Sequence, residues 1–137
     1  MPTYRTTSEE ETVALGERLA RTLPPHGVVL LTGNLGAGKT MLAKGIVSGL
    51  GAAPAEEVSS PTFTLIHEYG PPGSVYHIDL YRIETEREVR TLGLEEILDR
   101  DAVILVEWGE RFPHLWPPGH LEIRLETVGD ARRITLP

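Results

Sequence analysis

Cysteine and glutamine are missing from this chain of 137 residues, and Asn34 is its single asparagine. The absence of cysteine excludes disulfide bonds, thiolate metal sites and cysteine nucleophiles. Few heat-labile side chains, together with 11 prolines, are typical of a protein from a thermophile. Eleven of the 13 basic residues are arginine, which a GC-rich genome would also favour.

Long apolar runs are missing as well. A run such as residues 103–106 has the length of a strand, and none approaches the ~18 residues that a membrane span needs. The first residues, MPTYRTTSEEE, do not show the basic start and apolar stretch of a secretory signal. We therefore expect a cytoplasmic protein that does not associate with membranes.

Basic residues are too few and too scattered to predict a nucleic-acid surface. They number 13 against 20 acidic residues, which gives a formal net charge of -7. Proteins that hold RNA or DNA alone normally carry a basic patch, because phosphate contacts supply most of the affinity. If a nucleic acid is involved, we expect a partner protein to supply most of the contact.

The pattern of the chain predicts one domain, residues 1–137, of the α/β class. We expect a P-loop NTPase-like fold, in which helices flank a mostly parallel central sheet with antiparallel hairpin additions. Helices are predicted over residues 8–23, 39–50 and 84–98, the last broken at Gly93, and buried strands over residues 28–31 and 102–107. Antiparallel hairpins are predicted from residues 62–69 with 75–80, and from 121–125 with 132–136.

The sequence GNLGAGKT matches the phosphate-binding pattern G-x-x-x-x-G-K-[ST]. Its glycines let the backbone N–H groups approach phosphate oxygens, and the following helix adds the partial positive charge of its N-terminus. We expect Lys39 to reach the β- and γ-phosphates of ATP and the Thr40 hydroxyl to bind Mg²⁺. The flanking strand and helix favour this over a plain glycine-rich turn. The nucleotide-binding positions of this motif are Gly33, Asn34, Leu35, Gly36, Ala37, Gly38, Lys39 and Thr40.

Residues 103–107, VILVE, have the form of a Walker-B strand, an apolar run that ends in a carboxylate. In open α/β sheets the ligand lies at this carboxyl edge. We expect Glu107 to hold Mg²⁺ through water or to polarise the attacking water. An aspartate is usual at this position, so the choice between the two roles stays open.

Two other segments have both a functional and a structural interpretation. His77 and Asp79 share one face of the strand over residues 75–80. Asp79 is a candidate second ligand of Mg²⁺, but from the spacing alone a hydrogen-bonded polar pair at a strand end is the better interpretation. The segment SSPT, residues 59–62, is either a loop that closes over the γ-phosphate or a turn before a strand.

Several sequence signatures are missing, and their absence limits the classes of P-loop protein to which this chain can belong. Guanine-specific NTPases carry an Asn-Lys-x-Asp signature, and the single asparagine, Asn34, lies inside the glycine motif. An arginine-rich lid after Gly93 and a second acceptor domain are also missing. A small ATPase that acts on a protein partner is the leading hypothesis. A P-loop kinase of a small metabolite, and a nucleotide-dependent binding module with negligible hydrolysis, stay open as alternatives.

Four motifs in order, GNLGAGKT at 33–40, SSPTFTL at 59–65, YHIDLYR at 76–82 and LVEW at 105–108, closely resemble the bacterial TsaE (formerly YjeE) family. The resemblance covers residues 8–126, with LGERLA at 15–20 similar to the family's first helix. It implies the ATPase component of tRNA threonylcarbamoyladenosine (t6A) biosynthesis. The implied partners are TsaD and TsaB, which modify the adenosine next to the anticodon, so that tRNA is contacted only indirectly. ATP hydrolysis would reset that complex for another turnover.

The resemblance also implies roles for single residues around the metal. Thr40 and Glu107 match the family's Mg²⁺ positions, and Asp79 of the HxD motif lies close to them. With Lys39, the carboxylates of Glu107 and Asp79 form the expected catalytic group. Thr62, in the SPT segment that begins at Ser60, belongs to a switch-like loop.

Further nucleotide contacts are implied outside the glycine motif. They are Glu9 before the first helix, Trp108 after Glu107, and an arginine of the C-terminal hairpin, Arg132 or Arg133. Met41 stands where the family often has a second threonine, which removes one hydroxyl from the phosphate side of this nucleotide-binding position.

Overall fold

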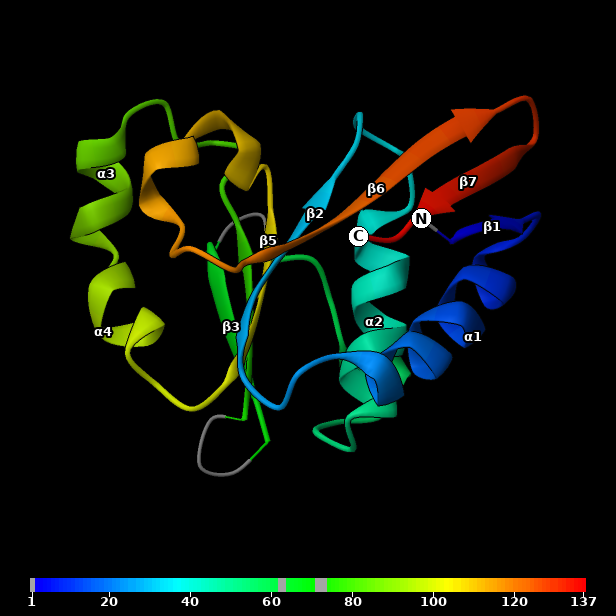
Figure 1. Cartoon of the computed structure of the whole chain (residues 1–137), viewed down its shortest axis with the longest axis horizontal. Helices are drawn as coiled ribbons and strands as arrows, with labels where there is room; N and C mark the ends of the chain where they lie inside the picture. The colour runs from blue at the N-terminus through cyan, green and yellow to red at the C-terminus, as the bar shows by residue number, and fades with distance from the viewer. Residues whose placement is uncertain (1, 62–63, 71–73) are drawn as a thin grey trace.

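The two buried apolar runs form neighbouring central strands of one sheet. The computed structural model of the protein describes residues 2–61, 64–70 and 74–137. Over these ranges the sheet has seven strands in the order β1-β7-β6-β2-β5-β4-β3 (Figure 1). The strands are β1 (Thr3–Thr6), β2 (Gly27–Thr32), β3 (Ile66–Tyr69), β4 (Val75–Asp79), β5 (Val103–Glu107), β6 (Leu121–Val128) and β7 (Ala131–Thr135).

Four strands at the centre, β6, β2, β5 and β4, run parallel. Their β-branched and aliphatic residues suit strands that are covered on both faces. The edges are antiparallel, because β3 pairs with β4 and β7 pairs with β6. These pairings confirm the mostly parallel sheet and both predicted hairpins. Parallel pairing also aligns the carboxyl ends of β2, β5 and β4 at one edge of the sheet.

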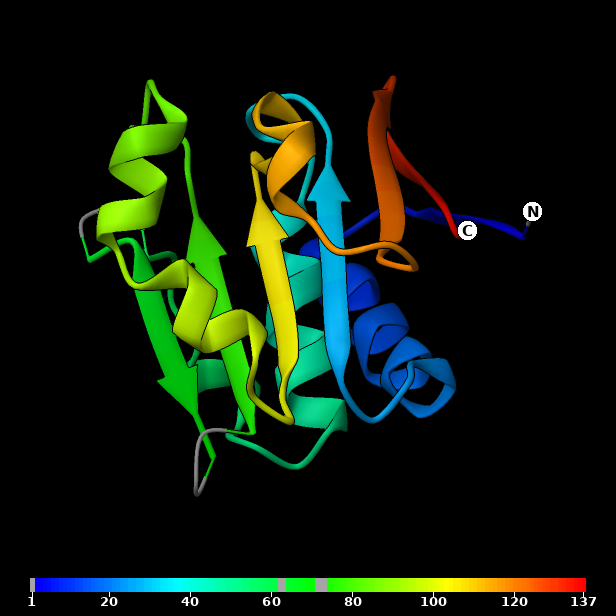
Figure 2. The same ribbon diagram turned by 60° about the vertical axis from the view of Figure 1, so that its left-hand side comes forward.

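Helices cover both faces of this sheet, as Figure 2 shows. On one face lie α1 (Glu9–Leu19) and α2 (Lys39–Gly49), and on the other α3 (Glu86–Thr91) and α4 (Leu94–Leu98). Successive residues of β2 and β5 point to opposite faces, so Val29 and Leu105 pack below α1 and α2, whereas Leu30 and Val106 pack below α3 and α4. Each aliphatic side chain buried in these two cores stabilises the fold by about 1.5–3 kcal/mol.

The helix ends follow their capping residues. Ser8 accepts a hydrogen bond from the backbone N–H of Glu11 and starts α1 as expected, while the Glu11 carboxylate bonds Thr7 rather than Ser8. Beyond Leu19 the predicted helix tightens into a 3-10 turn, η1 (Ala20–Thr22). Gly93, with φ of 80°, separates α3 from α4, which confirms the predicted break.

Some predicted bounds were wrong, and one strand was not predicted. The strand expected over 62–69 begins only at Ile66, because Leu65 has a left-handed φ of 70° that ends an extended run. Thr62 and Phe63 lie outside the described residues. Strand β6 runs three residues further than predicted, to Val128. Strand β1 exists because β7 offers it an antiparallel partner, a long-range pairing without a local sequence signal.

Three further short 3-10 turns lie in the loops, η2 (Ala55–Glu57), η3 (Gly109–Arg111) and η4 (Pro113–Leu115). Within the described ranges, no helix has the length and apolar character needed to cross a membrane.

Helices α1 and α2 approach each other closely through glycines. A Cβ added to Gly16 would lie 2.5 Å from the carbonyl oxygen of Leu42, and a Cβ on Gly45 would overlap the carbonyl oxygen of Val13. Both clashes are with backbone atoms, which cannot move aside as a flexible side chain would. This contact fixes α2, whose N-terminus carries the glycine motif.

We predict that Gly45→Ala lowers the free energy of unfolding by about 1–3 kcal/mol or more, because the methyl group forces the two helices apart. Urea unfolding followed by circular dichroism measures this difference. Ser48→Ala, a similar small change on the same helix, is the control and should stay within about 0.5 kcal/mol of the original protein. Equal stability of the Gly45 and Ser48 variants would contradict the close packing.

Candidate functional site

The glycine loop, residues 33–40, runs from the end of β2 into the first turn of α2. Gly36 and Gly38 have φ values of 80° and 98°, in the left-handed region that glycine adopts without strain. Gly38 is the N-cap of α2 and has no side chain with which to cap it. The first N–H groups of α2 are therefore open towards the adjoining cavity, an arrangement that favours binding of an anion.

Lys39 is held inside this loop although its side chain is cationic. It is only 4% exposed, and its Nζ donates a hydrogen bond of 2.7 Å to the carbonyl oxygen of Gly33. The same Nζ lies 3.5 Å from the ring centroid of Trp108, a cation–π contact. Burial lowers the pKa of Lys39 below its ordinary value, and the charges of Glu107 and Glu110 act in the opposite direction. A phosphate could replace either internal partner.

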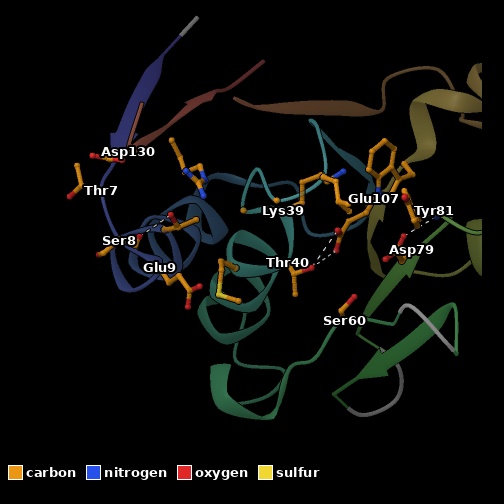
Figure 3. A pocket seen from close by; sticks show the side chains of 17 residues that line it. Thr7, Ser8, Glu9, Lys39, Thr40, Ser60, Asp79, Tyr81, Glu107 and Asp130 are labelled. Carbon is orange, nitrogen blue, oxygen red and sulfur yellow. Dashed lines mark hydrogen bonds between the residues drawn. The ribbon is translucent and has the colours of Figure 1, made fainter. Parts of the chain in front are cut away.

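Glu107 ends β5 and faces the glycine loop. Its carboxylate accepts from the Thr40 hydroxyl, with Oγ1 at 3.2 Å from Oε2 and 3.4 Å from Oε1 (Figure 3). From the neighbouring strand β4, His77 Nε2 lies 2.5 Å from Oε2 of the same carboxylate. Glu107 is 3% exposed and His77 is completely buried. One buried carboxylate thus joins the glycine loop to β4.

The second carboxylate, Asp79, pairs in register with Glu107 across β4 and β5. Burial raises the pKa of Asp79 above its ordinary value. The hydrogen bond from the backbone N–H of Tyr81, 2.9 Å from Oδ1, opposes this rise, and the negative charge of Glu107 adds to it. Two acidic groups and one lysine therefore share one poorly hydrated edge of the sheet, where charges interact strongly.

Trp108 adopts a strained conformation directly after Glu107. Its φ of 65° is left-handed, which costs a residue with a Cβ about 1–3 kcal/mol. The ring centroid lies 5.1 Å from that of Tyr81, and Arg111 Cζ lies 4.8 Å from the Trp108 ring. Arg111 also donates a hydrogen bond of 2.6 Å to the carbonyl oxygen of Tyr81. In this conformation the indole packs against the edge of the core beneath α3 and α4 and also contacts Lys39.

These side chains surround a cavity of about 550 Å³. Figure 3 shows its two ends, with the carboxylates, Lys39 and Thr40 at one and the N-terminal residues with Asp130 at the other. Of the residues predicted from the sequence, it is lined by Glu9, Leu35, Gly36, Gly38, Lys39, Thr40, Met41, Asp79, Glu107, Trp108 and Arg132. Such a volume is sufficient for a small-molecule ligand.

Three of the predicted residues that the structure describes do not line this cavity. Gly33 and Asn34 line a smaller one of about 350 Å³ beside β6, and Ala37, within the glycine loop, is buried. Thr62 lies outside the described residues, so its predicted role stays a prediction. Ser60, from the same predicted switch-like segment, does line the large cavity.

The structure distinguishes the two arginines of the C-terminal hairpin. Arg132 lines the cavity beside Gly38, whereas Arg133 points to the other face of β7 and contacts Glu126 at 3.2 Å. This difference follows from the alternation of side chains along a strand. The prediction named both positions because the sequence does not show which face of β7 meets the cavity.

Sequence reasoning missed several lining residues, namely Thr7, Ser8, Thr12, Tyr81 and Asp130. Ser8 caps α1, and Ser8 and Thr12 reach the cavity because α1 packs on α2. The β1–β7 pairing places the N-terminal residues beside the C-terminal hairpin, which contains Asp130, and this long-range pairing has no local sequence signal. Tyr81 reaches the cavity because it follows Asp79 at the end of β4.

The oxygen ligands at the glycine-loop end suit Mg²⁺. Thr40, Glu107 and Asp79 offer one hydroxyl and two carboxylates, the hard donors that this ion prefers. Within the described part of the chain, no group of three or more His, Asp or Glu side chains is arranged to hold a metal alone. This set fits an ion that completes its shell with water and substrate phosphates.

The raised pKa of Asp79 generates a prediction on stability. An acid whose pKa rises on folding binds more protons in the native state, so the free energy of unfolding falls as the pH increases from about 3.9 through the folded pKa. Asp79→Asn should therefore be more stable than the original protein at pH 7, and this advantage should shrink towards zero below about pH 3.9. Urea unfolding from pH 3.5 to 7, without nucleotide or metal, measures both.

The control for this measurement is Asp101→Asn, an exposed aspartate before β5. It removes the same charge and should give no comparable gain at pH 7. A lower stability of Asp79→Asn at pH 7 would mean that the carboxylate is favoured by its surroundings.

Comparison with known proteins identifies the family of this chain. The family model for "Threonylcarbamoyl adenosine biosynthesis protein TsaE" matches residues 6–134. The chain is 41% identical over 131 residues to the tRNA threonylcarbamoyladenosine biosynthesis protein TsaE of Bacillus subtilis strain 168, a match covering 95% of this chain and 80% of that protein. It is 40% identical over 128 residues to the protein of the same name from Rickettsia conorii, with 93% and 72% covered.

Among solved structures, the crystal structure of Bacillus subtilis YdiB superposes with a TM-score of 0.76 at 36% identity. The match covers 98% of this chain and 83% of YdiB. Sequence and fold thus agree over nearly the whole length of this chain. This chain therefore belongs to the TsaE family of threonylcarbamoyl adenosine biosynthesis proteins.

Proposed function

We propose that this chain is the ATP-binding and ATP-hydrolysing component of the bacterial t6A machinery and that it supports turnover of the TsaD–TsaB threonylcarbamoyl transferase in the cytoplasm. The observation that carries the proposal is one cavity in which the open N-terminus of α2, Lys39 and the Thr40–Glu107 pair meet. Family membership supports the role in tRNA modification. The net charge of -7 supports docking on proteins rather than direct binding of tRNA.

The glycine loop then acts as a P-loop. The backbone N–H groups at the start of α2 receive the phosphates, and Lys39 leaves the Gly33 carbonyl oxygen to contact the β- and γ-phosphates. This exchange is favourable because a partly desolvated ammonium gains a charged partner in place of a neutral one. Trp108 excludes water from one side of Lys39 and strengthens that contact.

The carboxylates supply the second part of the mechanism. Thr40, Glu107 and Asp79 would hold Mg²⁺, which, when bound, neutralises charge on the phosphate oxygens. Glu107 is placed to orient or polarise a water near the γ-phosphate, since its carboxylate lies next to Thr40 at the phosphate end of the cavity. At the other end, Glu9, Met41 and Arg132 would contact the nucleoside.

Steady-state ATP hydrolysis tests this function. We expect a low rate for the protein alone and a clear increase when TsaD and TsaB are added, because the partners complete or order the site. A rate unaffected by the pair would contradict the partnership. Formation of a phosphorylated metabolite would instead favour the alternative of a small-molecule kinase, which family membership does not favour.

We predict that Lys39→Ala reduces hydrolysis by at least about 100-fold, because the charge that opposes the developing negative charge on the phosphates is lost. The matched control is Lys44→Ala, which removes the other lysine of the chain from the same helix. It should hydrolyse ATP at the original rate. Near-normal turnover by the Lys39 variant would refute the proposed site.

A further inference from the structure

His77 makes a contact that the proposed mechanism does not yet use. It is completely buried on β4 and does not line the cavity. Its Nε2 lies 2.5 Å from Oε2 of Glu107. Among the described residues, Nδ1 of His77 is the one buried side-chain nitrogen or oxygen without a hydrogen-bond partner.

The Nδ1 without a partner argues against a role for His77 in packing alone. An apolar side chain would fill the same space without a buried polar atom that lacks a partner, which proteins generally avoid. The bond to Glu107 is what the imidazole supplies here. We assign the proton to Nε2, because a carboxylate oxygen can only accept, and the lone pair to Nδ1, which has no partner.

The strand register explains how the contact is made. His77 is level with Leu105, and Asp79 with Glu107, on the adjacent parallel strands β4 and β5. Alternate residues share a face, so the imidazole points to the same side of the sheet as the carboxylate and reaches it from beneath the cavity. On the cavity side, the carboxylate's other described side-chain partner is the Thr40 hydroxyl.

The two partners of Glu107, Thr40 and His77, behave differently in the proposed reaction. The Thr40 hydroxyl is expected to turn to the metal, and it then no longer fixes the carboxylate. His77 does not line the cavity, so it keeps its hydrogen bond to Glu107 when ligand binds. A single donor at Oε2 holds the group in place and leaves Oε1 free to face metal or water.

We propose that His77 is a positioning residue, which donates from Nε2 to hold the Glu107 carboxylate in the orientation that metal binding and water activation require. This inference rests on the proposed function of Glu107. It adds a residue that acts through Glu107 and contacts neither nucleotide nor metal.

Two amide substitutions separate the hydrogen bond from other effects. Glutamine places an N–H at the position of Nε2 and asparagine places one at the position of Nδ1, so His77→Gln keeps the donor and His77→Asn loses it. We expect His77→Asn to lower kcat by about 10–100-fold with KM changed by less than about threefold, as for other residues that orient a catalytic ligand. His77→Gln should restore most of that loss. Equal rates for the two variants would overturn the proposal.

A double-mutant cycle with Glu107→Ala tests whether the effect passes through the carboxylate. Once Glu107 is removed, His77→Asn should change the residual rate by less than about twofold, because the coupled partner is gone. A further loss as large as in the original background would show a general structural effect and would overturn the proposal.

Two measurements do not require turnover and hold even if the protein proves not to hydrolyse ATP. By proton–nitrogen NMR, a protected imidazole N–H of the original protein should disappear in His77→Gln and shift strongly in Glu107→Ala. By calorimetry, the gain in ADP affinity on adding Mg²⁺ should be smaller for His77→Asn than for His77→Gln. Two results would refute the role of His77 whether or not ATP is hydrolysed. One is an imidazole signal that does not shift in Glu107→Ala, and the other is an equal Mg²⁺-dependent gain in ADP affinity for His77→Asn and His77→Gln.

Discussion

Parallel pairing of β2, β5 and β4 is the constraint on which the rest of the structure depends. Because the three strands run in one direction, the glycine loop, Glu107 and Asp79 leave the sheet at the same edge. The pairing is possible only because helices cover both faces and bury the aliphatic residues between them. A shift of one residue between β4 and β5 would turn Asp79 away from Glu107 and break the contact with His77. The site is thus a consequence of the register of the core.

Charge burial is the second determinant of the site. Lys39, Glu107 and Asp79 are each less than 6% exposed, a state that costs free energy unless every charge has partners. Without a ligand, groups of the chain itself act as these partners. A carbonyl oxygen and an indole ring hold Lys39, and a hydroxyl holds one side of Glu107. A phosphate and a metal ion can replace all three because each is a weaker partner than a full opposite charge.

The sequence was sufficient for the parts of the site that are local. The glycine loop has a fixed spacing, and Glu107 ends an apolar run, so both could be placed on an edge of a parallel sheet from pattern alone. The far end of the cavity could not be predicted in this way. Ser8 reaches it because α1 packs on α2. Asp130 reaches it because β1 pairs with β7, and these two strands are more than 100 residues apart in the sequence. The choice of Arg132 over Arg133 likewise depends on which face of β7 meets the glycine loop.

His77 could be placed beside Asp79, but its bond to Glu107 depends on the register of two strands that are separated by a helical segment.

In the described part of the chain, backbone strain lies at the ends of two strands, directly before β3 and directly after β5. Among the described residues, the two non-glycine residues with positive φ are Leu65 and Trp108. Leu65 accepts a hydrogen bond from the backbone N–H of Asp79 through its carbonyl oxygen, and Trp108 directly follows Glu107. Strained backbone therefore adjoins both acidic residues, through the bond of Leu65 to the Asp79 backbone and through the position of Trp108 after Glu107. The buried Nδ1 of His77, which lacks a partner, is a further unfavourable feature beside them. Such costs persist only where the surroundings fix them, and here the two apolar cores do so. If strain orients the carboxylates before ligand arrives, binding energy need not be used to order them, and the ligand-free protein is less stable than its core alone would allow.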